Sequence, residues 1–298
     1  MTTRRVFLGG LAAASTRCAW AGVGERQLKI GAISYSYRTM PHRPFAMLDY
    51  AVASGVDSLE LMGRDAEVDA GAPDPYTRTS EGRKALNEWR LRAGSAVFRE
   101  IAEKYAVRGM GVHIVKFGEI GDLGMSDALM DYFFGVAQAF GAGAVTCEIP
   151  KPVAWERCGK RLAAWSEKFG VKVAFHNHLQ INAKTYEGPL LGYGPGLAIN
   201  YDIAQYIAAN DDDPVAFVEK YRDRIFSIHV KDGTSRAKGG KLTAFGEGDV
   251  PLVRLFKTVR RINPSIACDI ELEYPMPKDS DAVKEVAKCV AYCHRALV

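Results

Sequence analysis

Cysteine is sparse in this sequence, and the cysteines that occur are not spaced in pairs. There are six in 298 residues, and one of them, Cys18, lies in a segment that we expect to be removed. The odd number that remains, without paired spacing, argues against a disulfide framework. Cys147 and Cys268 lie instead within apolar runs, where a free cysteine packs as a small hydrophobic side chain.

Long hydrophobic runs, strong net charge and a dinucleotide-binding fingerprint are also missing. No apolar stretch approaches the roughly 20 residues that span a membrane, so no membrane span is expected. The net charge is only +4 at pH 7, and no basic stripe favours a nucleic-acid partner. No G-x-G-x-x-G motif follows the first predicted strand, which counts against a dinucleotide-binding fold.

The first 21 residues have the features of a twin-arginine signal peptide. Arg4 and Arg5 precede a weakly apolar run rich in Gly and Ala, and Ala19-Trp20-Ala21 offers a small-x-small cleavage site. We therefore expect residues 1–21 to direct export by the twin-arginine route. Residues 22–298 would form the mature domain, which would be periplasmic or extracellular.

Short β-branched or aromatic runs alternate with helical patterns along the rest of the chain. The runs predict strands over residues 28–37, 57–62, 107–117, 144–149, 171–178, 196–202, 225–232 and 266–273. Such alternation favours a parallel α/β architecture, and eight units favour a single-domain (β/α)8 TIM barrel over an open sheet. Residues 64–79 and 233–248 are expected to be long loops that act as lids or binding loops. A helix over residues 80–105 is expected to break near Gly94.

Ionisable side chains gather where the later strands end. These side chains are His176 and His178, Asp202, His229 and Lys231, and Glu271 and Glu273. Because the active site of such a barrel lies at the C-terminal ends of its strands, we expect them to lie close together. Imidazole and carboxylate together form a ligand set that suits Mn, Co, Mg or Zn.

The spacing of these residues along the strands indicates which of them would be metal ligands. A lone histidine in a strand is more often a core residue than a ligand, but His176 and His178 are two positions apart and would point to the same side. Glu271 and Glu273 are in phase in the same way. We expect Glu271, the deeper of the two, to be the ligand, and Glu273 either to support the ligands from outside or to face the substrate.

Other strand-end residues are candidates for proton transfer and substrate binding. Glu148 ends the fourth strand and is a metal ligand, a catalytic base or an exposed strand-end glutamate. His113 and Lys116, near the end of the third strand, are candidates for binding substrate oxygens. Lys231 is another, although Lys231 and Asp232 would equally form an ion pair that stiffens the rim.

At these motifs the chain resembles the xylose isomerase-like barrel superfamily. The resemblance runs from about Leu28 to the C-terminus and is greatest to an exported branch described as sugar phosphate isomerase/epimerase. The motifs that carry it are His176-Asn177-His178, Asp202 in NYDIAQY, HVKD at 229–232, GEG at 246–248 and IELEYP at 270–275. In the order in which they occur, they are typical of that superfamily.

The resemblance implies one divalent metal ion, Mn, Co, Zn or Mg. Its ligands would be His176 or His178, Asp202, His229 and Glu271; we assign His178 to the metal, and Glu148, Glu271 and His176 to catalysis. Three positions depart from the pattern, and one of them is Ser235, which stands where an arginine is usual six residues after the seventh-strand histidine. Gln205 replaces the histidine of an Asp-x-x-His motif, and His176 stands where epimerases carry a catalytic glutamate.

The function implied is that of a metal-dependent isomerase or epimerase of a small carbohydrate. It would remove a proton next to a carbonyl, through an enediolate that the metal stabilises. The alternative is a dehydratase, hydratase or lyase that carries out β-elimination on a keto-sugar or inosose. An endonuclease IV-like phosphodiesterase and a non-catalytic sugar-binding barrel are less favoured, and the sequence leaves homo-oligomer formation open.

Overall fold

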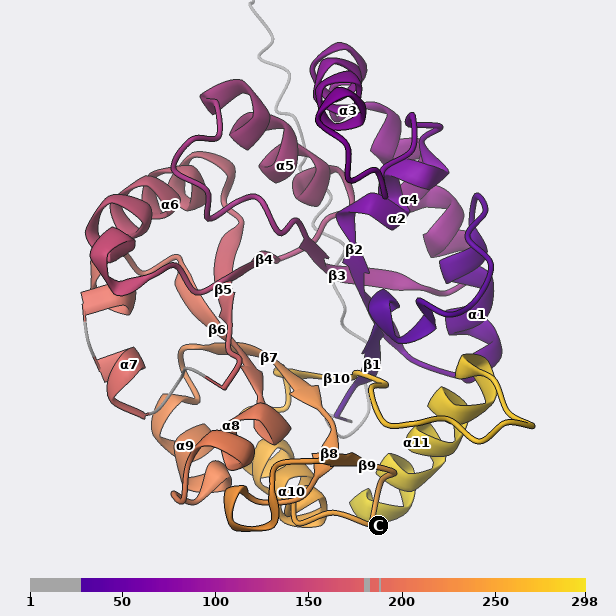
Figure 1. Ribbon diagram of the computed structural model, residues 1–298, viewed down its shortest axis with the longest axis vertical. Coiled ribbons are helices and arrows are strands. Elements are labelled where there is room, and N and C mark those ends of the chain that lie inside the picture. The colour runs from indigo at the N-terminus through magenta and orange to yellow at the C-terminus, as the bar shows by residue number, and fades with distance from the viewer. Residues whose placement is uncertain (1–27, 180–182, 188) are drawn as a thin grey trace, which may run out of the picture.

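Eight parallel strands form a closed barrel at the centre of the molecule. They are β1 (Ile30–Ile33), β2 (Ser58–Met62), β3 (Gly111–Lys116), β4 (Ala144–Glu148), β5 (Lys172–His176), β6 (Leu197–Asp202), β7 (Ile225–Val230) and β10 (Ala267–Ile270). In this computed structural model, which describes residues 28–179, 183–187 and 189–298, the strand order is β1-β10-β7-β6-β5-β4-β3-β2 (Figure 1). The predicted (β/α)8 TIM barrel is confirmed. The predicted signal peptide lies outside the described residues.

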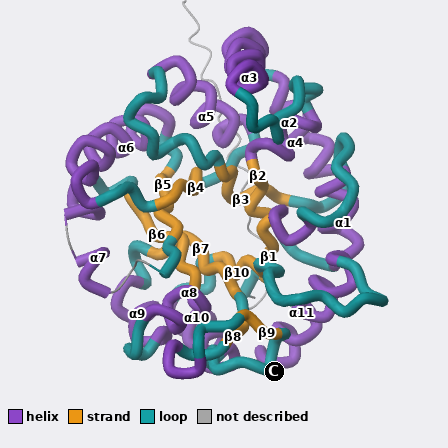
Figure 2. Tube along the Cα trace, in the orientation of Figure 1, coloured by secondary structure: helices purple, strands orange, loops and turns teal. Residues whose placement is uncertain are grey.

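Helices surround the barrel on its outer side, as Figure 2 shows. They are α1 (Ala46–Ser54), α2 (Gly63–Asp69), α3 (Ser80–Ala93), α4 (Val97–Val107), α5 (Asp127–Ala139), α6 (Trp155–Phe169), α7 (Ala183–Glu187), α8 (Ile203–Ala209), α9 (Pro214–Tyr221), α10 (Leu252–Ile262) and α11 (Ala282–Leu297). None of these helices in the described ranges is both long and apolar enough to cross a membrane.

The barrel strands are buried on both faces, which explains their continuous apolar character. All six residues of β6 are buried, and outward-facing Tyr201 stacks on Phe217 of α9 with ring centroids 4.6 Å apart. The inside of the barrel is more polar than the branched apolar layers usual in this fold. Glu60, Asn200 and Ser227 are fully buried there and bonded to one another through Asn200.

Several element boundaries differ from the prediction. β1 stops at Ile33 and continues as a 3₁₀ turn, because Ser34 turns inward, accepting a hydrogen bond from Met62 N and donating one to Asp65. α4 runs to Val107, so that β3 begins only at Gly111. The predicted break near Gly94 is confirmed by the gap between α3 and α4.

Both predicted long loops contain regular structure. α2 occupies the start of the first, and its first residue, Gly63, lies so close to the Phe117 ring that a Cβ would be 2.1 Å from it. The second contains an antiparallel pair, β8 (Asp232–Gly233) and β9 (Leu242–Thr243). These short elements were not predicted, because short polar segments carry too few apolar residues to show a period. The role of the two segments as lids or binding loops stays a prediction.

Asp69, at the end of α2, supports the N-terminus of α1. Its carboxylate accepts hydrogen bonds from Phe45 N at 2.5 Å and from Tyr105 Oη at 2.8 Å. Phe45 has a left-handed backbone (φ 61°), which this bond helps to hold. Burial raises the pKa of Asp69 to about 6, more than the hydrogen bonds from Phe45 and Tyr105 lower it.

A pH-dependent contribution to stability follows from this shift. The folded protein takes up a proton at Asp69 near pH 6, whereas the unfolded chain does so near pH 4. Relative to an Asp69→Asn variant, the native protein should therefore gain roughly 2 kcal/mol between pH 7 and pH 4.5. Urea unfolding of both proteins at the two pH values measures this gain. A stability difference that stays constant with pH would contradict it.

Candidate metal centre

Four buried side chains from four strand ends converge inside the mouth of the barrel. His176 ends β5, Asp202 ends β6, His229 lies in β7 and Glu271 directly follows β10. One ligand atom from each lies within 4.8 Å of the corresponding atoms of the other three. The parallel register places them there, since Asp202 pairs with His229 and Asp269, two residues before Glu271, also pairs with His229.

His229 is held between two carboxylates. Its Nε2 lies 2.8 Å from Glu60 Oε2, and its Nδ1 lies 2.8 Å from Glu271 Oε2. Burial would lower the pKa of His229, but attraction to Glu60 and Glu271 outweighs it and raises the pKa to about 10. Without a metal, His229 is therefore a cation with a proton on each ring nitrogen. A metal at Nδ1 would displace the proton shared with Glu271, while Nε2–H stays donated to Glu60, as expected of a histidine oriented for a metal.

His176 is oriented by a second buried partner. Its Nδ1 lies 2.6 Å from Asn200 Oδ1, while the amide nitrogen of Asn200 donates to Glu60 Oε2 and to Ser227 Oγ. Because Asn200 Oδ1 accepts, the proton of His176 is on Nδ1, which leaves a lone pair on Nε2. Burial, followed by the nearby charges of Lys116 and His229, holds the pKa of His176 well below its usual value. The imidazole is therefore neutral, the form that binds metals.

His178 lies outside this group, although we had assigned it to the metal. β5 ends at His176, so the alternation that would turn both rings to one side no longer applies at His178. His178 is half exposed, with Nε2 2.7 Å from Glu148 Oε2, and Lys116 Nζ lies 3.2 Å from Glu148 Oε1. Glu148, Lys116 and His178 thus form a polar cluster of their own beside the buried group. The two clusters touch where the rings of His176 and His178 meet edge to face.

The other predicted site residues are divided between the mouth and the interior. Lys231 Nζ contacts Asp202, Glu271 and Glu273, and Glu273 itself is not one of the four converging residues. His113 does not reach the four. It pairs with Asp269 at 2.9 Å, two residues deeper along β10 than Glu271.

Sequence reasoning missed the residues that support the site. Glu60 is fully buried in β2 and contacts both His229 and Asn200, and Asn177 fixes the backbone of Asp202 through hydrogen bonds to its N and O. A charged residue inside the apolar run SLELM was the available signal for Glu60. Asn177 and Asn200 lie within motifs that carry the resemblance, but neutral amides are common at strand ends and neither residue was given a role.

Asp232 anchors the loop that follows β7. Its carboxylate accepts hydrogen bonds from the backbone N–H groups of Gly233, Gly246, Gly248 and Val250, at 2.7 to 3.3 Å. A Cβ on Gly248 would lie 2.2 Å from Asp232 Oδ1, so only glycine fits there. This explains the G-E-G motif structurally and makes Asp232 a loop anchor; Lys231 is paired elsewhere.

Replacing Asp232 by alanine should therefore loosen this loop. Four N–H groups would lose a charged acceptor, two of them in buried hydrogen bonds, and the expected loss of unfolding free energy is about 3 kcal/mol. Denaturant unfolding measures the loss, and limited proteolysis should show new cleavage between residues 234 and 248. Asp249→Ala is the matched control, since Asp249 binds Ser235 N and Lys238 on the solvent side of the same loop. Equal effects of the two changes would contradict the anchoring role.

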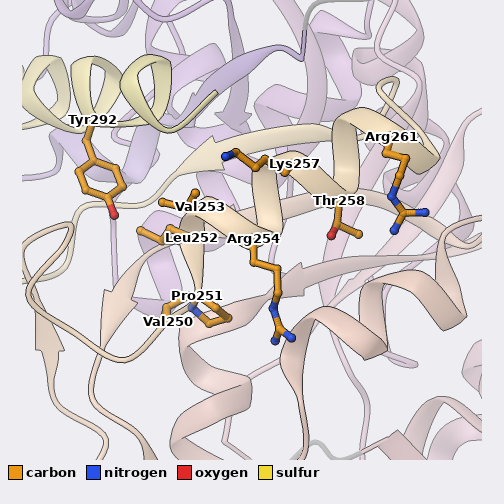
Figure 3. A pocket seen from close by; sticks show the side chains of 9 residues that line it. All are labelled: Val250, Pro251, Leu252, Val253, Arg254, Lys257, Thr258, Arg261 and Tyr292. Atoms are coloured by element: carbon orange, nitrogen blue, oxygen red, sulfur yellow. The ribbon is translucent and has the colours of Figure 1, made fainter. Parts of the chain in front are cut away.

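A separate shallow groove lies outside the barrel. It is about 600 Å³ in volume and runs along α10, with Tyr292 of α11 at one end (Figure 3). Two of its three cations are already paired, Arg254 with Asp213 and Arg261 with Glu219. None of the four converging residues lines it. The groove is thus distinct from the group of four residues at the mouth.

The four converging residues suit a divalent metal ion. Two imidazoles and two carboxylates are a donor set for Zn, Mn, Co or Fe. The ring nitrogens turned away from the group both have buried partners, which leaves a donor nitrogen of each ring on the inner side. His176, Asp202, His229 and Glu271 are therefore the residues that would hold the ion.

Comparison with known proteins places this fold in a family. A family model described as xylose isomerase-like TIM barrel matches residues 48–293. No curated protein matches the chain. Among solved structures, the probable 3-DHS dehydratase AsbF from Bacillus anthracis has a TM-score of 0.64 at 16% identity, with 89% of this chain and 99% of that chain covered.

Two further structures share the barrel. The IOLI protein, crystallised with a zinc atom, has a TM-score of 0.63 at 14% identity, with 91% and 98% of the chains covered. D-psicose 3-epimerase, crystallised with D-fructose, has a TM-score of 0.60 at 12% identity, with 91% and 99% covered. At such identities the likeness shows the fold alone. With the family model matching most of its length, the chain belongs to the xylose isomerase-like TIM barrel family.

Proposed function

We propose that the protein is a divalent-metal-dependent isomerase or epimerase that acts on a sugar or a sugar-derived ketone. The observation that carries this proposal is the convergence of His176, Asp202, His229 and Glu271 within 4.8 Å at the barrel mouth. The zinc atom in the IOLI structure and the epimerase among the similar folds support it. The chemistry that a bound ion supplies is polarisation of a carbonyl and its neighbouring hydroxyl, which stabilises charge as a proton is removed.

Glu148 is the residue best placed to accept that proton. It lies beside the four converging residues, paired with Lys116 and His178. Burial alone would raise the pKa of Glu148, but the hydrogen bond from His178 and the charge of Lys116 lower it below its usual value. Glu148 is therefore ionised at neutral pH and can act as a base. Glu271, the other candidate base, is already engaged by His229 and Lys231.

β-Elimination from a keto-sugar is the second candidate, and His178 favours it. The hydrogen bond to Glu148 raises the pKa of His178, and the ring is half exposed. It can thus give a proton to a departing hydroxyl next to the base that removes the α-proton. The dehydratase among the similar folds supports this alternative.

Metal analysis and solvent exchange test the proposal together. About one Mn, Co, Zn or Mg per purified chain is expected, whereas three would favour a nuclease and none a sugar-binding barrel. Keto-sugars incubated with the protein in D₂O should then take up deuterium at the carbon next to the carbonyl. An isomerase or epimerase returns a sugar of unchanged mass apart from the label, and an elimination gives a product lighter by one water. A wild type that cannot be loaded with any of these metals would refute the enzyme proposal.

We also propose that the mature domain acts outside the cytoplasm. The support is the Arg4-Arg5 pair and the Ala19-Trp20-Ala21 site in the sequence. Changing both arginines to lysine should trap the precursor in the cytoplasm, as measured by cell fractionation and by the mass of the N-terminus. Correct export of the Lys-Lys variant would contradict this route.

A further inference from the structure

Lys231 is a cation enclosed by the carboxylates of the candidate metal centre. Its side chain is 4% exposed, and Nζ lies 2.7 Å from Asp202 Oδ2, 2.7 Å from Glu271 Oε2 and 2.5 Å from Glu273 Oε2. An ammonium group is buried only where it is paired, and here three carboxylates provide the pairing. The positive charge of Lys231 therefore offsets part of the negative charge of these three carboxylates.

Two of these three partners are residues that would bind a metal. Asp202 and Glu271 belong to the group of four, whereas Glu273 does not and is more exposed, at 24%. A divalent ion and an ammonium group that use the same two carboxylates repel each other over a few ångströms, since little water separates them. Metal binding and the pairing of Lys231 with Asp202 and Glu271 therefore oppose each other.

Lys231 lies between two residues whose side chains are anchored. On one side His229 is fixed by Glu60 and Glu271, and on the other Asp232 is fixed by the N–H groups of its loop. Only the side chain of Lys231 is free to turn. Glu273 is the one of its three carboxylates that stays available when a metal takes the other two.

We infer that Lys231 competes with the metal for Asp202 and Glu271, and that Glu273 holds the ammonium group to one side when the metal binds. This inference rests on the proposed metal dependence. Lys231 and Glu273, which the sequence suggested as substrate-binding residues, thereby set the affinity of the site for its ion.

Titration of the metal-stripped full-length protein with Mn²⁺ tests the inference. Lys231→Met keeps the length of the side chain and removes the charge, so it should tighten Mn²⁺ binding by about tenfold or more. Glu273→Gln should weaken Mn²⁺ binding by roughly fivefold, because Lys231 loses its alternative partner. Lys284→Met, which removes an exposed lysine paired with Asp281, is the matched control and should leave the affinity unchanged.

The double variant separates this mechanism from a simple charge effect. If Glu273 acts by holding Lys231, Glu273→Gln should have almost no effect in the Lys231→Met background. If Glu273 attracts the ion directly, its effect persists there, which would overturn the holding role. The Glu273→Gln single variant also gives a reading if Lys231→Met does not fold without metal, since unchanged Mn²⁺ affinity would overturn the inference.

The outcomes distinguish this inference from the proposed function. A folded Lys231→Met variant with unchanged or weaker Mn²⁺ affinity would show that Lys231 is a structural brace, even if the wild type binds the ion well. A wild type and variants that all fail to bind Mn²⁺ would refute both. Tighter Mn²⁺ binding by Lys231→Met than by a wild type that itself binds the ion would support competition.

Discussion

Replacing Asp202 by asparagine is expected to lower the metal content of the purified protein from about one ion per chain to nearly none. Asp202 provides one of two carboxylates in a group of four donors. Removing its charge should therefore lower the metal affinity by more than the 10- to 100-fold that follows removal of a residue hydrogen-bonded to a metal ligand. Elemental analysis and Mn²⁺ titration measure the change. The turnover of any keto-sugar that the wild type converts should fall by at least the same factor as the metal affinity.

Asparagine isolates the effect of the charge at this position. Asp202 also caps α8, with Oδ1 accepting a hydrogen bond from Gln205 N at 2.9 Å, and asparagine preserves such a cap. Asp213→Asn is the matched control, since Asp213 caps α9 through Val215 N and lies outside the group of four. Full metal loading of Asp202→Asn would show that the ion, if any, binds elsewhere.

Replacing Glu60 by glutamine should weaken metal binding by roughly 10- to 100-fold although Glu60 is not a ligand. Glu60 accepts hydrogen bonds from His229 Nε2 and Asn200 Nδ2, and Asn200 in turn fixes the tautomer of His176. Without that carboxylate, neither imidazole is held with its donor nitrogen toward the centre. Breaking a buried ion pair on one side is also expected to cost about 3–5 kcal/mol of stability in the metal-free protein.

A structural role alone would not produce this combination of effects. ¹⁵N chemical shifts of the two histidine rings report their tautomers, and they should change in Glu60→Gln. Glu67→Gln is the matched control, because Glu67 is equally buried and is ion-paired with Arg90 at 2.7 Å, away from the four donors. If both variants lose stability but keep their metal affinity, Glu60 is a structural residue only.

The alternation of apolar runs with helical patterns in the sequence was sufficient to predict the barrel. Because the strands are buried on both faces, each of them is a nearly continuous apolar run. The ends of elements were less predictable. Nothing in the run from Leu28 to Tyr37 shows that Ser34 would bond to Met62 N and Asp65 and end the strand. That contact joins residues about 30 positions apart, and local sequence carries no record of it.

Within the site, the sequence pointed to the right strands and to three of the four converging residues as ligands. The choice between His176 and His178 depended on where β5 ends, and a shift of one residue at a strand end reverses which side chains face inward. Glu60 was hidden for a related reason. A charge inside an apolar run marks Glu60 as unusual, but its role follows only from its partners, His229 and Asn200, which lie across the barrel.

The single anchor of the loop after β7 has a practical consequence for protein engineering. Asp232 ties both ends of the segment between Thr234 and Phe245 to one carboxylate, through Gly233 on one side and Gly246 and Gly248 on the other. Both ends of this loop are therefore held at one residue, independently of the sequence between them. Its interior can be exchanged for sequences of other length and polarity while the base and the barrel stay as they are. Libraries built between these two points would vary this loop and leave the four converging residues untouched.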